Sequence, residues 1–190
     1  MPELLLTLPY SAPINKYDTL PRVESNTVVS FSNSSREKNM SSLFIKLNLK
    51  SEAEILVLSA PESFESEIAT LNGVSVLREA DTIEKTTFSI AFVTTLEEVK
   101  KIAAIVAEKT QGDAVVWFAY PKASSKKYQC KFNRDNGWDV LGKLGFEGVR
   151  QVAIDEDWSA LRFRRVEFIK KMSRDKKRAM SEKGKARVTG

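Results

Sequence analysis

The sequence predicts an α/β domain of three layers, in which helices cover both faces of an open, mostly parallel sheet that ends in an antiparallel strand pair. Three observations lead to this fold class. Short runs of consecutive apolar residues, typical of strands buried on both faces, alternate with amphipathic helical patterns. Such alternation favours parallel strands joined by helical crossovers. The last two apolar runs are separated by only four residues, which indicates a hairpin.

The first half of the expected domain begins with a buried strand. The apolar run Ile55–Leu58 predicts this strand. A capping pattern that begins at Ser59 predicts a short helix, and Gly73 with the preceding asparagine ends it. Residues 74–77 and 87–93 predict the second and third strands, so the chain returns to the sheet twice after its first helix.

The helix after the third strand has the clearest signals in the chain. Thr94 and Thr95 each precede a glutamate by three residues, so either can form a capping box. Apolar residues then recur at spacings of three and four on one face, until Gly112 ends the element. We therefore expect a long amphipathic helix packed against the sheet.

The late half predicts a central strand, a helix and the antiparallel pair. Residues 114–120 are continuously apolar, as expected for a strand in the middle of the sheet. A short helix is expected to begin near Asn133 and to end at Gly145. Residues 149–155 and 160–164 predict the two antiparallel strands.

The 190-residue chain is long enough for one domain with a sizeable core, which we place at residues 40–173. Residues 1–39 show no sustained helical or strand periodicity of apolar residues, so we expect a disordered extension, with Met40 as the native start. Residues 174–190 predict a basic, disordered tail. The segment from Leu161 to the last residue contains twelve basic and three acidic residues, a net charge of +9. The rest of the chain has a net charge of −4.

Composition excludes several kinds of chemistry. The sequence has no histidine, which rules out Ser-His-Asp and Cys-His nucleophile systems and removes the commonest metal ligand. Cys130 is the only cysteine, so an internal disulfide is excluded and a reducing cytoplasm is expected. No apolar run is long enough to cross a bilayer. We expect no metal, no cofactor and no membrane association, and no catalytic residue stands out.

The loop that follows the central strand is the strongest candidate for a ligand site. It leaves the carboxyl end of that strand, where open α/β sheets bind ligands, and it has no acidic residue before Asp135. The amides of the helix expected near Asn133 would add positive charge. A solvated basic loop is the simpler interpretation. The candidate anion-binding residues are Lys122, Lys126, Lys127, Lys131, Asn133 and Arg134.

A second group of polar residues surrounds the expected hairpin turn. Its carboxylates could bind a divalent cation or share a proton, but neutralising cross-strand pairs with the nearby arginines are the simpler interpretation. The tryptophan of this turn predicts core or rim packing. The further candidates are Asp135, Asp155, Asp157, Trp158, Arg162 and Arg164.

The late half resembles that of Rossmann-type methyltransferases. Those enzymes also have a strand, a helix, a Gly-Phe turn and an antiparallel strand pair, as residues 114–120, 134–144, Gly145-Phe146 and 149–163 predict here. The resemblance implies a Rossmann-like fold. Methyltransferases of this type hold their cofactor with a glycine-rich loop after the first strand, whereas this chain has no glycine between Leu58 and Gly73.

Residues 54–168 more closely resemble a bacterial family known as a domain of unknown function. The shared motifs are Tyr120-Pro121-Lys122 after the central strand, Asn133-Arg134-Asp135 before the next helix, and a segment from Asp155 to Arg164 that contains Trp-Ser-Ala-Leu-Arg-Phe-Arg. This resemblance implies the same fold and supplies no activity.

The residues favour a non-catalytic cytoplasmic module that binds an anionic small molecule or a partner at the loop of residues 121–135. One alternative is a divergent methyltransferase-like transferase without the glycine-rich loop, with Asp135 or Asp155 as a base and an adenosine-type cofactor. Another is an accessory protein that binds nucleic acid or an acidic protein through the basic tail. The oligomeric state is open.

Overall fold

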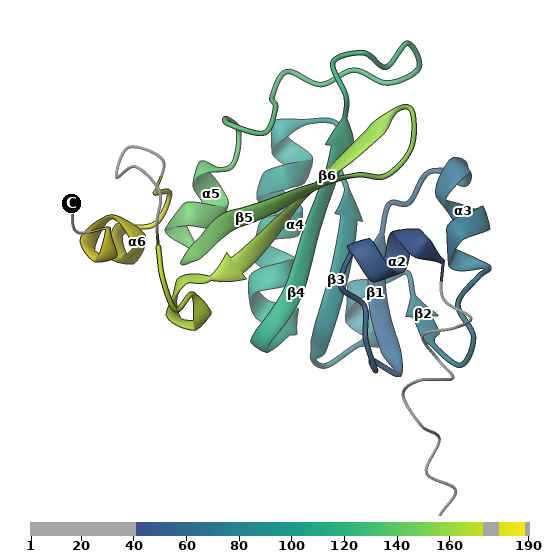
Figure 1. Cartoon of the computed structure of the whole chain (residues 1–190), viewed down its shortest axis with the longest axis horizontal. Helices are drawn as coiled ribbons and strands as arrows, with labels where there is room; N and C mark the ends of the chain where they lie inside the picture. The colour runs from purple at the N-terminus through teal and green to yellow at the C-terminus, as the bar shows by residue number, and fades with distance from the viewer. Residues whose placement is uncertain (1–40, 173–178, 189–190) are drawn as a thin grey trace, which may run out of the picture. The chain divides into compact units, whose positions relative to one another are not determined.

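The computed structural model describes residues 41–172 and 179–188 and confirms the α/β fold class. Six strands form one sheet in the order β2-β1-β3-β4-β6-β5 (Figure 1). The strands are β1 (Glu54–Leu58), β2 (Ser75–Leu77), β3 (Thr86–Phe92), β4 (Thr110–Pro121), β5 (Phe146–Ala153) and β6 (Trp158–Arg165). The helices are α2 (Ser42–Lys46), α3 (Glu62–Ile68), α4 (Leu96–Lys109), α5 (Asp139–Lys143) and α6 (Glu182–Arg187), with short 3-10 turns at Ala80–Thr82 and Val166–Phe168. The extension expected over residues 1–39, Met40 and residues 174–178 lie outside the described residues.

The first four strands run parallel, and β6 lies antiparallel between β4 and β5. The chain forms β4, then α5, then the Gly145-Phe146 turn, and then the antiparallel pair. This order is the one predicted from the resemblance to Rossmann-type methyltransferases. The fold is therefore a Rossmann-like open sheet, mostly parallel, with an antiparallel pair at its C-terminal end.

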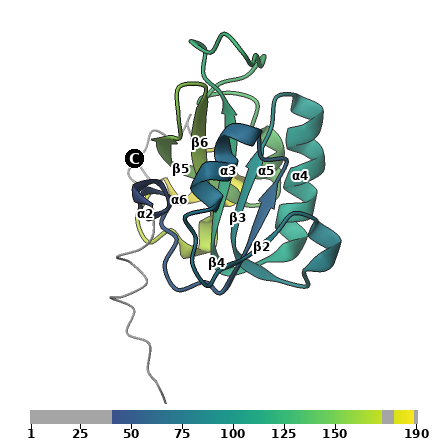
Figure 2. The same cartoon turned by 90° about the vertical axis from the view of Figure 1, so that its right-hand side faces the viewer.

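Helices cover both faces of the sheet, as the buried strands require. Figure 2 shows α4 and α5 on one side of the sheet and α2 on the other. Alternate residues of β4 reach the two cores: Phe118 packs on the side of α4, and Trp117 on the side of α2 and α3. The indole Nε1 of Trp117 donates to the carbonyl oxygen of Leu47 at 2.8 Å, which fastens the segment after α2 to the sheet.

The capping box expected at the start of α4 is present. The amide of Glu98 donates to Oγ1 of Thr95 at 3.2 Å, and the Glu98 carboxylate accepts from the amides of Thr94 and Thr95 at 2.6 and 3.0 Å. Burial alone raises the pKa of Glu98, but these backbone hydrogen bonds outweigh it and lower the pKa below its ordinary value. The carboxylate therefore stabilises the helix start while it is ionised.

The helix expected to begin near Asn133 begins instead at Asp139 and has five residues. The backbone between these positions forms a turn, because Gly137 has a φ of +91° that a helix cannot contain. Side chains also take the hydrogen bonds that helix amides would use. Oδ1 of Asn133 accepts from the amide of Asp135 at 2.8 Å, and Oδ1 of Asn136 accepts from the amide of Asn133 at 3.0 Å.

The C-terminal segment differs from the tail expected at residues 174–190. Residues 179–188 contain α6 and dock on the domain through Glu147, which is fully buried in β5. Its carboxylate accepts from the amides of Met180 and Ser181 at 3.0 and 2.8 Å, and from the Ser181 hydroxyl at 2.7 Å. The backbone also approaches closely at Gly142, where a Cβ atom would lie 2.6 Å from the carbonyl oxygen of Met180.

Residues 41–172 and 179–188 contain neither a candidate membrane-spanning helix nor a candidate metal cluster. None of their helices is long and apolar enough for a transmembrane span. In the same residues, no three cysteine, aspartate or glutamate side chains come together in a way that could hold a metal ion.

Candidate functional site

A hollow of about 950 Å³ lies at the carboxyl end of β4, beneath the loop that follows it. Tyr120 at the end of β4, Gln151 of β5 and Ser159 of β6 contribute polar groups, and residues 121–125 and 128–134 form the loop side. Ligands of open α/β sheets bind beyond the carboxyl ends of the strands, so the hollow lies where the fold class predicts a site.

Tyr120 provides a nearly buried hydroxyl in this hollow. The side-chain amide of Gln151 donates to it at 3.1 Å, which connects β4 to β5 across β6. Burial raises the pKa of the Tyr120 hydroxyl, although the positive charge of Arg134 opposes this effect. The hydroxyl thus stays protonated near neutral pH and can donate a hydrogen bond to a ligand.

The predicted cations do not all face the hollow. Lys122, Lys131 and Arg134 line it, as does Asn133, whereas the exposed Lys126 and Lys127 are not among the residues that line it. Nζ of Lys122 donates to the carbonyl oxygen of Asp155 at 2.6 Å, so this lysine braces the hairpin turn. Nε of Arg134 pairs with the neighbouring Asp135 at 3.2 Å.

The helix amides expected to strengthen an anion site at Asn133 are absent from that position, because α5 begins six residues later at Asp139. The amides of Asn133 and Asp135 already donate to asparagine side chains within the turn. The anion site expected from convergent lysines and helix amides is therefore not assembled in that form.

The carboxylates of the hairpin turn hold the turn itself. Oδ1 of Asp155 accepts from the amides of Asp157 and Trp158 at 2.9 and 2.7 Å. The carboxylate of Asp157 accepts from the Ser125 hydroxyl at 2.7 Å, which ties the basic loop to the hairpin. Neither carboxylate forms the cross-strand arginine pair expected from the sequence. Asp155 is used in local hydrogen bonds of the turn, and Asp157 in the hydrogen bond to the basic loop.

Two of the three arginines of β6 have other partners. Arg164 forms a bidentate ion pair with Asp113 of β4, and its hydrogen bonds, together with its charge, lower the pKa of that carboxyl. Arg165 donates to the carbonyl oxygen of Ala107 at 2.8 Å and lies over the ring of Phe146. Trp158 is buried, in agreement with the expected packing role. Arg162 has no hydrogen bond or ion pair within residues 41–172 and 179–188.

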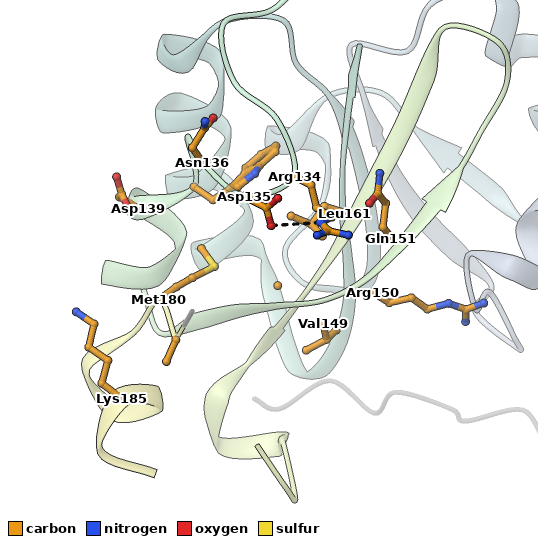
Figure 3. A pocket seen from close by; sticks show the side chains of 13 residues that line it. Arg134, Asp135, Asn136, Asp139, Val149, Arg150, Gln151, Leu161, Met180 and Lys185 are labelled. Atoms are coloured by element: carbon orange, nitrogen blue, oxygen red, sulfur yellow. Dashed lines mark hydrogen bonds and ion pairs between the residues drawn. The ribbon is translucent and has the colours of Figure 1, made fainter. Parts of the chain in front are cut away.

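A second hollow, of about 910 Å³, adjoins the first through Arg134 and Gln151, which line both. Met180 and Lys185 of the C-terminal segment and Asp139 of α5 form its other side (Figure 3). Sequence reasoning missed Tyr120, Gln151 and the residues of the C-terminal segment. The position of Tyr120 at the end of a buried strand was a usable signal, but the docking of a basic segment through a buried glutamate was not visible in the sequence.

The crossover point of the sheet lies between β1 and β3. The chain continues from β1 to β2 on one side of this point and from β3 to β4 on the other side. Ser59, directly after β1, has a φ of +54°, and the segment Ser59–Glu62 contains no glycine. Without glycine, the backbone here cannot approach an adenosine-type cofactor in the way a glycine-rich loop does. These residues do not fit a cofactor held in the manner of a glycine-rich loop.

No protein-family model and no curated protein matches the chain. Among solved structures, it is similar to a SAM-dependent methyltransferase from Aquifex aeolicus, with 12% identity, a TM-score of 0.44, and coverage of 72% of this chain and 100% of the other. N-methyltransferase NodS from Bradyrhizobium japonicum WM9 has 13% identity, a TM-score of 0.43, and coverages of 69% and 96%. The fibrillarin pre-rRNA processing protein from Methanococcus jannaschii has 12% identity and a TM-score of 0.41. That match covers 60% of this chain and 66% of the fibrillarin, slightly less than two thirds of its length.

These matches correct the leading interpretation of the sequence. A non-catalytic module was expected, whereas structures with a similar arrangement include proteins named as methyltransferases. At these identities and TM-scores, the activities of those proteins are not assigned to this chain.

Proposed function

We propose that the chain is a divergent methyltransferase-like transferase that lacks the glycine-rich cofactor loop. The observation that carries this proposal is the antiparallel insertion of β6 between β4 and β5, beside a hollow at the carboxyl end of β4. The late half of Rossmann-type methyltransferases was the basis of the sequence resemblance, and β4, α5 and the strand pair reproduce its order.

The hollow is the proposed acceptor site. It combines a buried, protonated hydroxyl at Tyr120, the amide of Gln151 and the hydroxyl of Ser159 with the positive charge of Arg134. These groups can orient a polar acceptor by hydrogen bonds. Neither Asp135 nor Asp155 is proposed as a base, because Asp155 holds the hairpin turn and Asp135 pairs with Arg134.

The resemblance to the bacterial domain of unknown function supports the same location. Two of its motifs, Tyr120-Pro121-Lys122 and Asn133-Arg134-Asp135, contribute five of their six residues to the lining of the hollow. We propose that the chain belongs to that family and that this hollow is the site the motifs share.

Thermal unfolding of the full chain with S-adenosylhomocysteine tests the transferase proposal. A compound that binds only the folded state raises Tm, and about 1 kcal/mol corresponds to roughly 2–4 °C for a chain of this length. We expect a rise in Tm for the wild type and a larger rise for Ser59→Gly, because this substitution removes a side chain from the crossover point.

Asn48→Gly is the matched control, since Asn48 also has a positive φ, +63°, but lies before β1. It should leave the ligand-induced rise unchanged. If neither the wild type nor Ser59→Gly responds to millimolar ligand, an adenosine-type donor is excluded and the proposal fails.

A further inference from the structure

Strands β5 and β6 carry three arginines on one face, at Arg150, Arg162 and Arg164. Leu161 and Phe163 belong to the core on the side of α4 and α5, so the alternating arginines of β6 lie on the opposite face. Arg150 is directly opposite Arg162 in the β5–β6 register and shares that face. In Figure 3 the side chain of Arg150, which also lines the second hollow, points away from Met180 and Gln151.

An irregularity in β5 produces this pairing. Gly148 lies opposite Phe163, but Arg150, two positions later, lies opposite Arg162, only one position away in β6. The extra residue is Val149, and such bulges redirect the side chains that follow them. In a regular register Val149 would oppose Arg162. The bulge therefore places a second guanidinium beside the first.

The charges on this face are not balanced within the described residues. Asp113 is the carboxylate that forms an ion pair here, and both its oxygens bind Arg164. In residues 41–172 and 179–188, neither Arg150 nor Arg162 has an ion pair, and Nε of Arg162 is buried without an acceptor. Burial lowers the pKa of Arg162, and the charges of Arg164 and Arg150 lower it further, against the opposing effect of Asp113.

Like charges placed directly opposite each other destabilise a strand pair, and a buried donor without an acceptor adds to that cost. Both effects disappear when an anion lies between the two guanidiniums. A carboxylate has two oxygens and is matched by one guanidinium, whereas a phosphate has enough oxygens to accept paired hydrogen bonds from two.

We propose that Arg150 and Arg162 form a phosphate-binding site on the face of the β5–β6 pair opposite α4 and α5. Neither arginine lines the hollow at the carboxyl end of β4, although Arg150 also lines the second hollow. The site does not depend on the transferase proposal. Its ligand is a phosphate group, carried either by a small phosphorylated molecule or by the backbone of a nucleic acid.

Binding of two probes to the full chain tests the site. The first is inorganic phosphate, measured by Tm at constant ionic strength against chloride. The second is a short DNA duplex, measured by fluorescence anisotropy. We expect at least one probe to bind the wild type, and Arg150→Gln and Arg162→Gln to weaken that binding about tenfold or more, as the loss of a charge-assisted hydrogen bond implies.

Arg78→Gln is the control, because it removes the same charge from the opposite end of the sheet, where Arg78 pairs with Glu65. It should bind both probes as the wild type does. Without phosphate, Arg150→Gln should have an equal or higher Tm than the wild type because the repulsion is gone, which distinguishes a lost site from a damaged fold.

The pattern of binding identifies the source of the phosphate. A response to inorganic phosphate that both β5–β6 variants lose indicates a small phosphorylated ligand. Duplex binding that these variants lose, without a response to inorganic phosphate, indicates a nucleic-acid backbone. The proposal is overturned if neither probe binds, or if Arg150→Gln and Arg78→Gln bind both probes equally.

Discussion

Asp155 shows how a residue with the chemistry of a catalytic group can serve the backbone instead. The sequence places it among carboxylates that could bind a cation or act as a base. In the structure, Oδ1 accepts from two amides of its own turn, and Oδ2 accepts from the Ser63 hydroxyl at 3.3 Å. An aspartate that starts a tight turn has this role because its side chain reaches the amides two and three residues later.

Replacing Asp155 by alanine should lower the free energy of unfolding by about 1–2 kcal/mol, because two amides of the turn lose their acceptor. Asp155→Asn should lose less, since its side-chain oxygen can still accept. Urea unfolding measures both. Glu156→Ala, an exposed change in the same turn, is the control and should stay near the wild type. Equal stability of Asp155→Ala and Glu156→Ala would contradict the assigned role.

At the scale of single elements, the sequence was most informative where the signals were local. The capping box at Thr95 and Glu98 fixed the start of α4, and the apolar runs located β1, β3 and β4. The start of α5 was wrong by six residues, because the turn formed by Asn133 and Asn136 competes with a helix for the same amides. Propensity alone does not show which of two local hydrogen-bond patterns forms.

The capping box predicts a pH-dependent contribution to stability. Because folding lowers the pKa of Glu98, its contribution is complete above the unfolded pKa and is lost as the pH falls through the folded pKa. Glu98→Gln should therefore destabilise the chain by about 0.5–1 kcal/mol at neutral pH, and this difference from the wild type should shrink below about pH 4.

Glu97→Gln is the matched control, because Glu97 lies in the same first turn but outside the capping box. Urea unfolding at several pH values should show little difference between this variant and the wild type. A penalty for Glu98→Gln that persists unchanged at pH 3 would show that charge is not the cause.

At the scale of the whole molecule, the type of sheet was predictable from the sequence, but the long-range hydrogen bonds were not. Alternation and crossover rules predicted a mostly parallel sheet with an antiparallel pair, but the bond from Trp117 to Leu47 joins residues 70 positions apart. The bonds from the C-terminal segment to Glu147 span 33 and 34 positions. Neither partner has a local pattern that reveals the other. For the same reason the residues of both hollows could not be assembled from the sequence.

Glu147 should control the docking of the C-terminal segment. In Glu147→Ala, the Ser181 hydroxyl and the amide of Met180 lose their acceptor, and we expect the amides of residues 180–185 to exchange hydrogen about tenfold faster or more. Amides in the middle of β3 and β4 should keep their protection. NMR-detected exchange measures both groups.

Glu182→Gln removes the same charge from the first turn of α6, where Glu182 makes only an exposed pair with Lys185. This control should retain slow exchange. Slow exchange that persists in Glu147→Ala would mean that packing at Gly142, rather than the buried carboxylate, holds the segment.

The bulge in β5 has a consequence for contacts between copies of the chain. In the described part of the molecule, β5 and the three-residue β2 are the outermost strands, and exposed strand edges invite pairing with other chains. A short strand offers few hydrogen bonds to a newcomer, and a kinked strand that carries the exposed Arg150 resists a straight neighbour. Both edges are thus protected against open-ended growth of the sheet into aggregates, and light scattering of Arg150→Gln would show how much of that protection comes from one arginine.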